Sequence, residues 1–415
     1  MTTSAPTDRR NLAVIKALTY LMFAMFAMTT DSVGIIIPEI IKTFRLTLTA
    51  AGTFQYATMG GIAIAGLCLG QLADRIGRRP TIVVGLTLFA VASYLFAVGE
   101  AFVFFAILMG VSGIAIGIFK TGALALVGDI STSTAEHTSV MNRAEGFFGI
   151  GSIVGPAILA RLLTNGLSWK WLYVIAGSVC LLLIVMALRV KYPKSSRATQ
   201  GADTNRTMHA LTNPYVLSFS MAAFLYVGIE AAIYVWMPTL FASYRGSAVW
   251  LATYSVSVFF LLRAAGRFVG AWMLLRFRWD AVLTLFSGCI LLCFLLGVIG
   301  GAEWAVYVLP ASGLFMSVIY PTINSKGISC VPKAEHGAAA GVILFFTCVS
   351  AVVAPLVMGA VSDATGDIAH GFWLAAALAV VLFAGLLFNW LFTPTRAVLQ
   401  QQDVTEYSGQ AAAAR

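Results

Sequence analysis

The chain has 415 residues, of which 60% are hydrophobic and only 10% are charged, and it carries a formal net charge of +9. Soluble globular domains contain about 25% charged residues, so this composition excludes a soluble domain and predicts a polytopic membrane protein. The basic residues flank apolar runs and form no patch on a polar domain, which argues against binding to nucleic acid.

Twelve apolar stretches are long enough to cross a bilayer as helices, for which about 20 residues are needed. They lie at residues 13–40, 47–72, 80–98, 102–127, 140–164, 169–189, 213–240, 247–274, 280–299, 303–325, 337–361 and 368–393. A cytoplasmic N-terminus puts most Lys and Arg residues on cytoplasmic ends and loops, as the positive-inside rule requires. We therefore expect an all-α integral membrane fold of twelve transmembrane helices. Both termini are expected in the cytoplasm, and the location is the plasma membrane, the inner membrane in a bacterium.

A polar linker at residues 191–212 divides six apolar stretches from six. An offset of 200 residues places Pro38 on Pro238 and Gly70 on Gly270, within corresponding stretches of the two halves. The sequence therefore predicts an N-terminal six-helix bundle at 1–190, a C-terminal six-helix bundle at 213–393 and a cytoplasmic tail at 394–415. Parallel repeats of this kind are typical of transporters that bind their substrate at the midplane between the halves.

A short loop from Gly70 to Pro80 joins the second and third stretches. Its glycines permit tight turns, and Pro80 suits the first turn of a helix. The loop resembles the signature G-x-L-a-D-r-x-G-r-r of the major facilitator superfamily; the alternative is an ordinary basic loop. The resemblance implies that the aspartate braces an outward-facing state by contacting the start of the eleventh span, near Gly337. It implies a cytoplasmic gate made of Gly70, Asp74, Arg75, Gly77, Arg78 and Arg79.

Among the acids within apolar stretches, Asp31 and Glu230 are the candidates for function, because an ionised side chain inside a membrane costs several kcal/mol. Asp31 lies seven residues before Pro38 in the first stretch. Glu230 lies eight residues before Pro238 in the seventh. Acids at matched depth in both halves predict proton coupling through Glu230 and Asp31, with Glu230 favoured. The alternative for each is a buried acid held by a permanent arginine or backbone partner.

Three of the basic residues within the apolar stretches are also candidates for function. Lys120 in the fourth is expected either to pair with Glu145 in the fifth or to face the cavity and favour an anionic substrate. Arg263 and Arg267 share one helical face in the eighth. One of them is expected to neutralise an intramembrane acid or a substrate group, and snorkelling toward the cytoplasm is the alternative.

A polar and aromatic stripe on the seventh stretch suggests a sugar site. Tyr226, Glu230 and Tyr234 recur every four residues, and Gln55, Tyr320 and Asn324 lie in the second and tenth stretches. Flat rings stack on the apolar face of a sugar, while amides and hydroxyls bind its rim. The residues expected to contact solute are Gln55, Lys120, Tyr226, Tyr234, Arg263, Tyr320 and Asn324; Glu145 and Arg267 tune the charge around them.

Two segments resemble the fucose/hexose:proton symporter branch of the superfamily, FLYVGIE at 224–230 and GLFMSVIYPT at 313–322. That branch tends to carry an acid in its fourth span, where this chain has Lys120. A different segment, Gly151–Pro156, resembles the G-x-x-x-G-P motif of proton-coupled drug exporters, although the double glycine that follows in those proteins is missing here.

These patterns together predict a proton-coupled secondary active transporter that imports a small polar solute, expected to be a sugar, by alternating access. The alternatives are a proton-coupled drug or metabolite efflux antiporter and a carrier that takes up an organic or sugar-acid anion. No phosphate-binding glycine loop, nucleophile triad or metal-ligand cluster is visible, so we expect no enzyme activity, cofactor or metal. The expected partners are the solute, protons and the lipid bilayer, and we expect a monomer.

Overall fold

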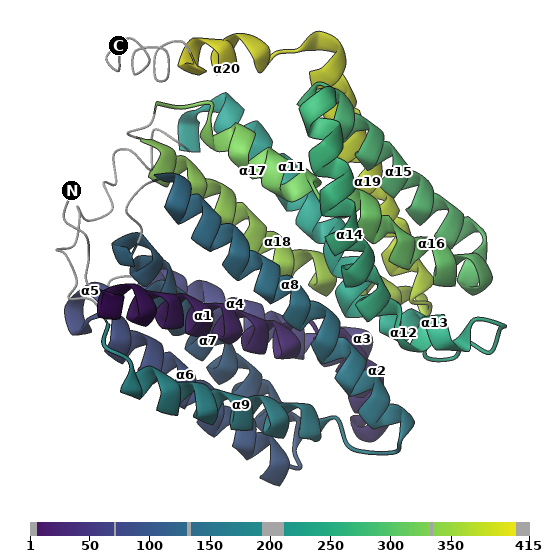
Figure 1. Ribbon diagram of the computed structural model, residues 1–415. Coiled ribbons are helices and arrows are strands. Elements are labelled where there is room, and N and C mark those ends of the chain that lie inside the picture. The colour runs from purple at the N-terminus through teal and green to yellow at the C-terminus, as the bar shows by residue number, and fades with distance from the viewer. Residues whose placement is uncertain (1–5, 70–71, 131–133, 193–210, 333–334, 404–415) are drawn as a thin grey trace. The chain divides into compact units, whose positions relative to one another are not determined.

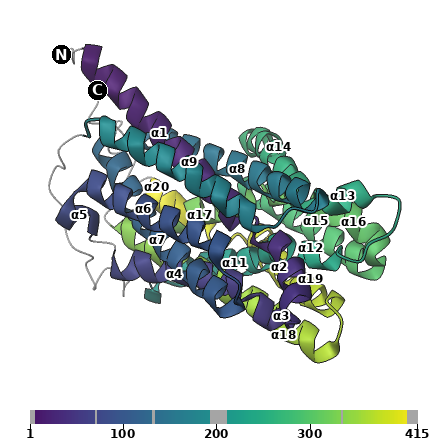
Figure 2. The ribbon, with the colours of Figure 1, turned by 90° about the horizontal axis from the view of Figure 1, so that it is seen from below.

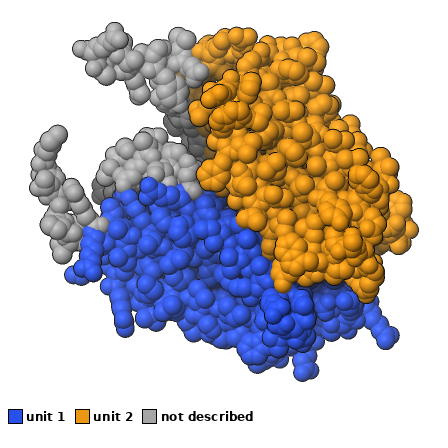
Figure 3. Space-filling model, turned by 45° about the vertical axis from the view of Figure 1, so that its right-hand side comes forward, with its two compact units in different colours: residues 1–199 blue, residues 200–415 orange. Residues whose placement is uncertain are grey.

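The computed structural model describes residues 6–69, 72–130, 134–192, 211–332 and 335–403, and the secondary structure within them is helical (Figure 1). The chain divides into two compact units, residues 1–199 and 200–415, which Figure 3 distinguishes by colour. Each unit is described by itself below. The boundaries predicted for the bundles and the tail stay predictions, and most of the predicted linker lies outside the described residues.

Unit 1 is built from nine described helices, which Figure 2 shows from a second direction. Its principal packed pairs are α4 with α7, α6 with α7, α1 with α8 and α6 with α9. The core between them is aromatic, with Phe26 in edge contact with Phe89 and 4.6 Å from Phe119 between ring centroids. The helices are α1 (Pro6–Thr30), α2 (Val33–Phe44), α3 (Leu48–Ala51), α4 (Thr53–Cys68), α5 (Leu72–Ile76), α6 (Arg78–Val98), α7 (Phe102–Ile130), α8 (Thr134–Thr164) and α9 (Lys170–Arg189).

Unit 2 repeats the pattern with α11 packed on α18, α15 on α16 and α19, and α14 on α16. A π-helical segment, η1, interrupts its first long helix. The elements are α11 (Pro214–Ala231), η1 (Ala232–Trp236), α12 (Met237–Leu240), α13 (Val249–Thr253), α14 (Ser255–Arg276), α15 (Trp279–Ile299), α16 (Gly301–Met316), α17 (Ile319–Ile328), α18 (His336–Thr365), α19 (Ala369–Phe392) and α20 (Arg396–Asp403).

Within the described residues, eleven helices are long and apolar enough to cross a membrane. The second predicted stretch, 47–72, contains α3 and the 16-residue α4, and it runs into residues 70–71, which are not described. Helix α4 is therefore shorter than the usual membrane-spanning length of about 20 residues. The chain is a multi-helix membrane protein, while the number twelve and the side of the termini stay predictions.

Helices α1 and α8 approach each other closely at two glycines of the predicted G-x-x-x-G-P motif. A Cβ atom on Gly155 would lie 2.5 Å from the Cα of Met28, and one on Gly151 would lie 2.8 Å from the carbonyl carbon of Ala24. Both contacts involve backbone, which cannot move aside as a flexible side chain can. Small residues four apart thus allow the two backbones to touch, as in other membrane helix pairs.

Cys330, beyond the end of α17, gives a prediction about pH. Burial raises the pKa of its thiol from 9.0 to about 12, against the opposite effect of Lys326. Between these values the unfolded chain loses the proton and the folded chain keeps it, so we expect the Cys330 thiol to lower stability as pH rises above about 9. Unfolding of wild type and Cys330→Ala followed between pH 7 and 10 checks this; an equal pH slope in both proteins would contradict it.

Candidate functional site

The intramembrane acid of unit 2 forms an ion pair. Glu230, in the last turn of α11, is 7% exposed, and its carboxylate contacts the guanidinium of Arg263 on α14. The guanidinium carbon of Arg263 also lies 6.0 Å from the centroid of the Phe260 ring. Of the two arginines predicted to neutralise an acid, Arg263 therefore does so within its own unit, whereas Arg267 lies half-buried one turn further along α14.

The tyrosines of the predicted sugar stripe occupy different environments. Tyr226 is fully buried, and its hydroxyl donates to the carbonyl oxygen of Met316 at 3.0 Å. Its ring faces that of Tyr320 with 6.2 Å between centroids. Tyr226 thus has no surface for a solute in this structure and ties α11 to the end of α16. Tyr234, Tyr320 and Asn324 are half-buried and keep some surface.

Both intramembrane acids lie where their span departs from regular α-helix. Glu230 comes two residues before η1, and the indole of Trp236 in that segment donates to the carbonyl oxygen of Pro355 at 3.1 Å. Asp31 lies between α1 and α2, where the hydroxyls of Thr30 and neighbouring residues donate to backbone carbonyls and compete with helical hydrogen bonding. Helical irregularities of this kind are frequent at functional sites.

In unit 1 the carboxylate of Asp31 accepts a hydrogen bond from the hydroxyl of Ser152 on α8. A pocket adjoins the same helix break; its lining residues include Thr29, Thr30 and Ser112. Gln55 on α4 is fully buried, and neither polar atom of its amide has a hydrogen-bond partner among the described residues. An unpartnered buried amide is costly, so Gln55 is a candidate for binding a ligand or a water molecule.

The expected pair of Lys120 and Glu145 does not form in the structure. The ammonium group of Lys120 lies 5.4 Å from the centroid of the Phe148 ring, and Glu145 is exposed. No ion pair among the described residues joins the two. Lys120 does lie against α8, as the prediction from its depth in the membrane required, but its neighbour is Phe148 and not Glu145. Depth does not fix which face of α8 a side chain meets.

At the predicted gate, Arg78 forms an ion pair with Asp129 at the end of α7, with 2.8 Å between its Nε and the carboxylate. Arg79 donates to the carbonyl oxygen of Leu188, and Gly77 has a φ of +92°, which favours glycine. Arg75 is exposed. Gly70, the side chain of Asp74 and the surroundings of Gly337 lie outside the described part of the structure, so the predicted brace stays a prediction.

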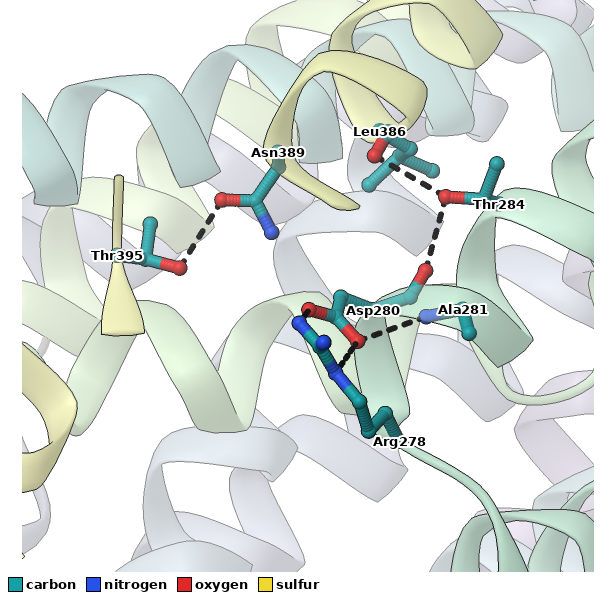
Figure 4. A network of polar contacts seen from close by, with 7 residues as sticks. All are labelled: Arg278, Asp280, Ala281, Thr284, Leu386, Asn389 and Thr395. Carbon is teal, nitrogen blue, oxygen red and sulfur yellow. Dashed lines mark hydrogen bonds and ion pairs between the residues drawn. The ribbon is translucent and has the colours of Figure 1, made fainter. Parts of the chain in front are cut away.

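A different arrangement surrounds Arg278, which stands 200 residues after Arg78. Figure 4 shows its guanidinium against the carboxylate of Asp280, with contacts of 3.1 and 2.5 Å. Asp280 also accepts from the backbone N–H of Ala281, and the hydroxyl of Thr284 lies 3.0 Å from the carbonyl oxygen of Leu386 on α19. Arg278 thus stabilises the start of α15, whereas Arg78 of α6 forms an ion pair with α7.

Replacing Arg78 by Gln is expected to lower stability and transport together. Arg78 and Asp129 are 7% and 11% exposed, and removing one partner of a buried ion pair costs about 3–5 kcal/mol. The exposed Arg278 side chain, 52% accessible, supplies the matched control, since Arg278→Gln should cost about 1 kcal/mol or less. Thermal unfolding in detergent compares the two variants; equal losses would show that the Arg78 pair has no special weight.

Asp129, Ser152 and Phe148 are site residues that the sequence did not single out. Each is a residue type common in helices or their ends, and each meets a partner distant in the chain: 51 residues separate Arg78 from Asp129, and 121 separate Asp31 from Ser152. Ser152 lies inside the Gly151–Pro156 motif, and Phe148 lies in the segment FFGIG at 147–151, which also resembles the symporter branch. No group of three or more His, Cys, Asp or Glu side chains among the described residues is placed to hold a metal ion.

The model of one protein family, the Major Facilitator Superfamily, matches residues 19–355, which is well over half of the chain. The chain belongs to the Major Facilitator Superfamily. It is therefore a membrane transporter and not an enzyme. The sequence resemblance drawn from the Gly70–Pro80 loop is confirmed.

Three relatives in this superfamily show the range of its cargo. The L-fucose-proton symporter of Escherichia coli (strain K12) is 24% identical, over 90% of this chain and 92% of its own length. The glucose/galactose transporter of Brucella abortus is 24% identical, over 94% and 99%. The quinolone resistance protein NorA of Staphylococcus aureus is 23% identical, over 90% and 95%. Sugar transporters and a drug-resistance protein are thus similar to this superfamily member to the same degree.

Among solved structures, the nucleoside transporter NupG matches with a TM-score of 0.73 and 15% identity, covering 91% of this chain and 98% of that one. At this identity the likeness shows the fold alone.

Proposed function

We propose that this superfamily member imports a small polar solute of the sugar class together with protons, by alternating access. The observation that carries the proposal is the Glu230–Arg263 pair beside the π-helical segment of unit 2. A proton that binds Glu230 removes the charge that holds Arg263, so the pair joins proton binding to a change in the helix at its irregular point. Similarity to a fucose-proton symporter and a glucose/galactose transporter supports the sugar class.

The other residues take supporting roles in this proposal. Asp31, held by Ser152, is the second coupling acid. The half-buried Tyr234, Tyr320 and Asn324 supply hydroxyl, amide and ring surface to the solute, and Gln55 supplies an amide. Tyr226 positions α11 from its buried site. The loop residues Asp74, Arg75, Arg78 and Arg79 gate the cytoplasmic side, and Arg267 adjusts the charge near Arg263. We place the protein, as a monomer, in a bacterial inner membrane with both termini inside.

The test is uptake of radiolabelled solutes into proteoliposomes of the purified protein. The screen covers hexoses, deoxyhexoses, amino sugars and sugar acids, each with and without an inward proton gradient. The proposal expects one of these solutes to accumulate only while the gradient lasts. Failure of every solute to accumulate would overturn it.

A second candidate function is proton-coupled efflux of drugs or metabolites. Gly151 and Gly155 of the G-x-x-x-G-P motif contact the α1 backbone closely, which supports the resemblance to drug exporters. The quinolone resistance protein NorA is also among the relatives. Extrusion of lipophilic cations from the same proteoliposomes, with no uptake of sugars, would favour this function over import.

A further inference from the structure

Two opposite charges in unit 1 lie against consecutive turns of α8. The hydroxyl of Ser152 binds the carboxylate of Asp31, and the ring of Phe148 lies under the ammonium group of Lys120. Phe148 and Ser152 are four residues apart, so they share one face of the helix with a rise of about 6 Å between them. This stripe of α8 therefore brings an acid from the α1–α2 break and a cation from α7 into one neighbourhood.

The charge of Lys120 is met by an aromatic face and not by a carboxylate. A cation over a ring gains about 0.5–2 kcal/mol, which is less than the cost of about 2.5–3.5 kcal/mol for a lysine at the centre of a membrane helix. Among the described acids nearby, Asp129 pairs with Arg78, Glu39 pairs with Lys42 and Glu145 is exposed. No described residue forms an ion pair with the half-buried Lys120, so its ammonium group is available to an anionic ligand.

The hydroxyl of Tyr20, which lies close to Phe148, is buried and makes no hydrogen bond among the described residues. Tyr20 on α1 stacks on Phe147, the residue before Phe148, with 5.4 Å between ring centroids. It is 7% exposed, and its hydroxyl has no hydrogen-bond partner among the described residues. An ammonium group and a phenolic hydroxyl are both donors, and a carboxylate with two acceptor oxygens matches them.

Apart from the half-buried Lys16 of α1, the other described charged groups on helices packed against this stripe are exposed, paired or hydrogen-bonded to backbone. Among the described side chains on α1, α2, α6, α7, α8 and α9 they are Arg10, Lys16, Glu39, Lys42, Arg78, Arg79, Asp129, Arg143, Glu145, Arg161, Lys170 and Arg189. Asp31 and Lys120 are thus the charges that the middle of this stripe meets.

We infer that Lys120 binds the carboxylate of the transported solute and that Asp31 carries the accompanying proton, so the cargo is a sugar acid and not a neutral sugar. The inference rests on the proposed proton-coupled import. An ionised Asp31 competes with the solute for the positive charge of Lys120. When Asp31 takes up a proton from the outer solution, its negative charge is removed and the carboxylate of the solute no longer competes with it for Lys120. Each transport cycle moves one proton, which Asp31 binds from the outer solution and Glu230 also carries before its release inside, together with one monoanion, so the transported charge sums to zero.

The test compares two driving forces on the unchanged protein in proteoliposomes. The probes are radiolabelled D-glucuronate and D-glucose, with either an inward proton gradient at zero potential or an interior-negative potassium diffusion potential at equal pH. Glucuronate is expected to accumulate at least about tenfold over the equilibrated level with the proton gradient, and not with the potential alone. A neutral sugar carried with a proton would respond to both.

Substitutions then assign the cation. Lys120→Met is expected to lower glucuronate uptake about tenfold or more, and Lys120→Arg to keep a measurable part of it. Lys170→Met is the matched control, because Lys170 also lies over a phenylalanine ring, 5.1 Å from the centroid of Phe105, but at the start of α9. It should leave glucuronate uptake unchanged. If Lys120→Met fails to give a monodisperse protein, the driving-force comparison on the unchanged protein still decides.

The outcomes separate this inference from the proposed function. Gradient-driven uptake of glucose that also responds to potential, with glucuronate excluded, would overturn the role of Lys120 and leave proton-coupled sugar import standing. Failure of both probes, and of every other solute in the screen, would overturn both. Glucuronate uptake that Lys120→Met leaves intact would place the anion site elsewhere and contradict the inference.

Discussion

Replacing Glu230 by Gln is expected to abolish gradient-driven accumulation of the solute while leaving exchange of labelled for unlabelled solute across the membrane intact. Glutamine keeps the shape of the side chain and cannot carry a proton. The variant should therefore allow the carrier to change state in both directions without coupling to the gradient. Counterflow exchange and uphill uptake, measured on the same proteoliposomes, separate the two activities. Normal uphill uptake by the variant would show that Glu230 does not carry the proton.

The ion pair with Arg263 requires a control, because Glu230→Gln also leaves a partly buried guanidinium without its carboxylate. Breaking one side of a buried pair costs about 3–5 kcal/mol, and removing both sides costs much less. The double variant Glu230→Gln/Arg263→Gln should therefore regain thermal stability. If the pair serves only to hold α11 against α14, the double variant regains uphill uptake as well; if Glu230 carries the proton, it does not.

Replacing Gly155 by Ala is expected to produce a large loss of stability. The new Cβ would lie 2.5 Å from the Cα of Met28, so α1 and α8 must move apart along their whole contact. Overpacking of this kind costs about 1–3 kcal/mol, and the upper end applies because backbone atoms cannot yield. We expect the apparent melting temperature in detergent to fall by about 5 °C or more, with loss of transport.

The same helix offers a matched control at Gly149. A Cβ there meets no atom within 4 Å, and alanine has the higher helix propensity. Gly149→Ala should therefore leave the melting temperature unchanged or raise it slightly. A fall as large as that of Gly155→Ala would mean that loss of glycine flexibility, and not the close contact of α1 with α8, sets the effect.

The fold class and the intramembrane acids could be predicted from the sequence because both depend on local composition. Long apolar runs predict spanning helices, and a single carboxylate within such a run is conspicuous, so Asp31 and Glu230 were identifiable. The short helix α4 shows the limit of this reasoning. The predicted stretch 47–72 contains no charged residue, but Thr47 begins a separate turn, α3, and the helix that follows is only 16 residues long.

The partners of these residues could not be predicted, since they depend on which faces of the helices meet. Helical spacing put Tyr226 in one stripe with Glu230 and Tyr234, yet Tyr226 is buried against Met316. Depth alone put Lys120 near Glu145, whereas Phe148, one turn away, holds it. The rotation of each helix about its own axis determines which residues surround Tyr226 and Lys120. A sequence that is apolar on every face does not reveal this rotation, because lipid and protein core are both apolar.

The π-helical segment η1 would account for a difference in spacing between the two spans that the predicted repeat pairs. Glu230 stands eight residues before Pro238, and Asp31 stands seven before Pro38. A π-turn closes on the fifth residue where an α-turn closes on the fourth, so it takes in one additional residue with little added length. An insertion in the second copy would otherwise have turned every side chain upstream of it by about 100°. Confined to Ala232–Trp236, the extra residue would leave the Pro214–Ala231 helix, and Glu230 near its end, in the orientation that the helix would have without an insertion.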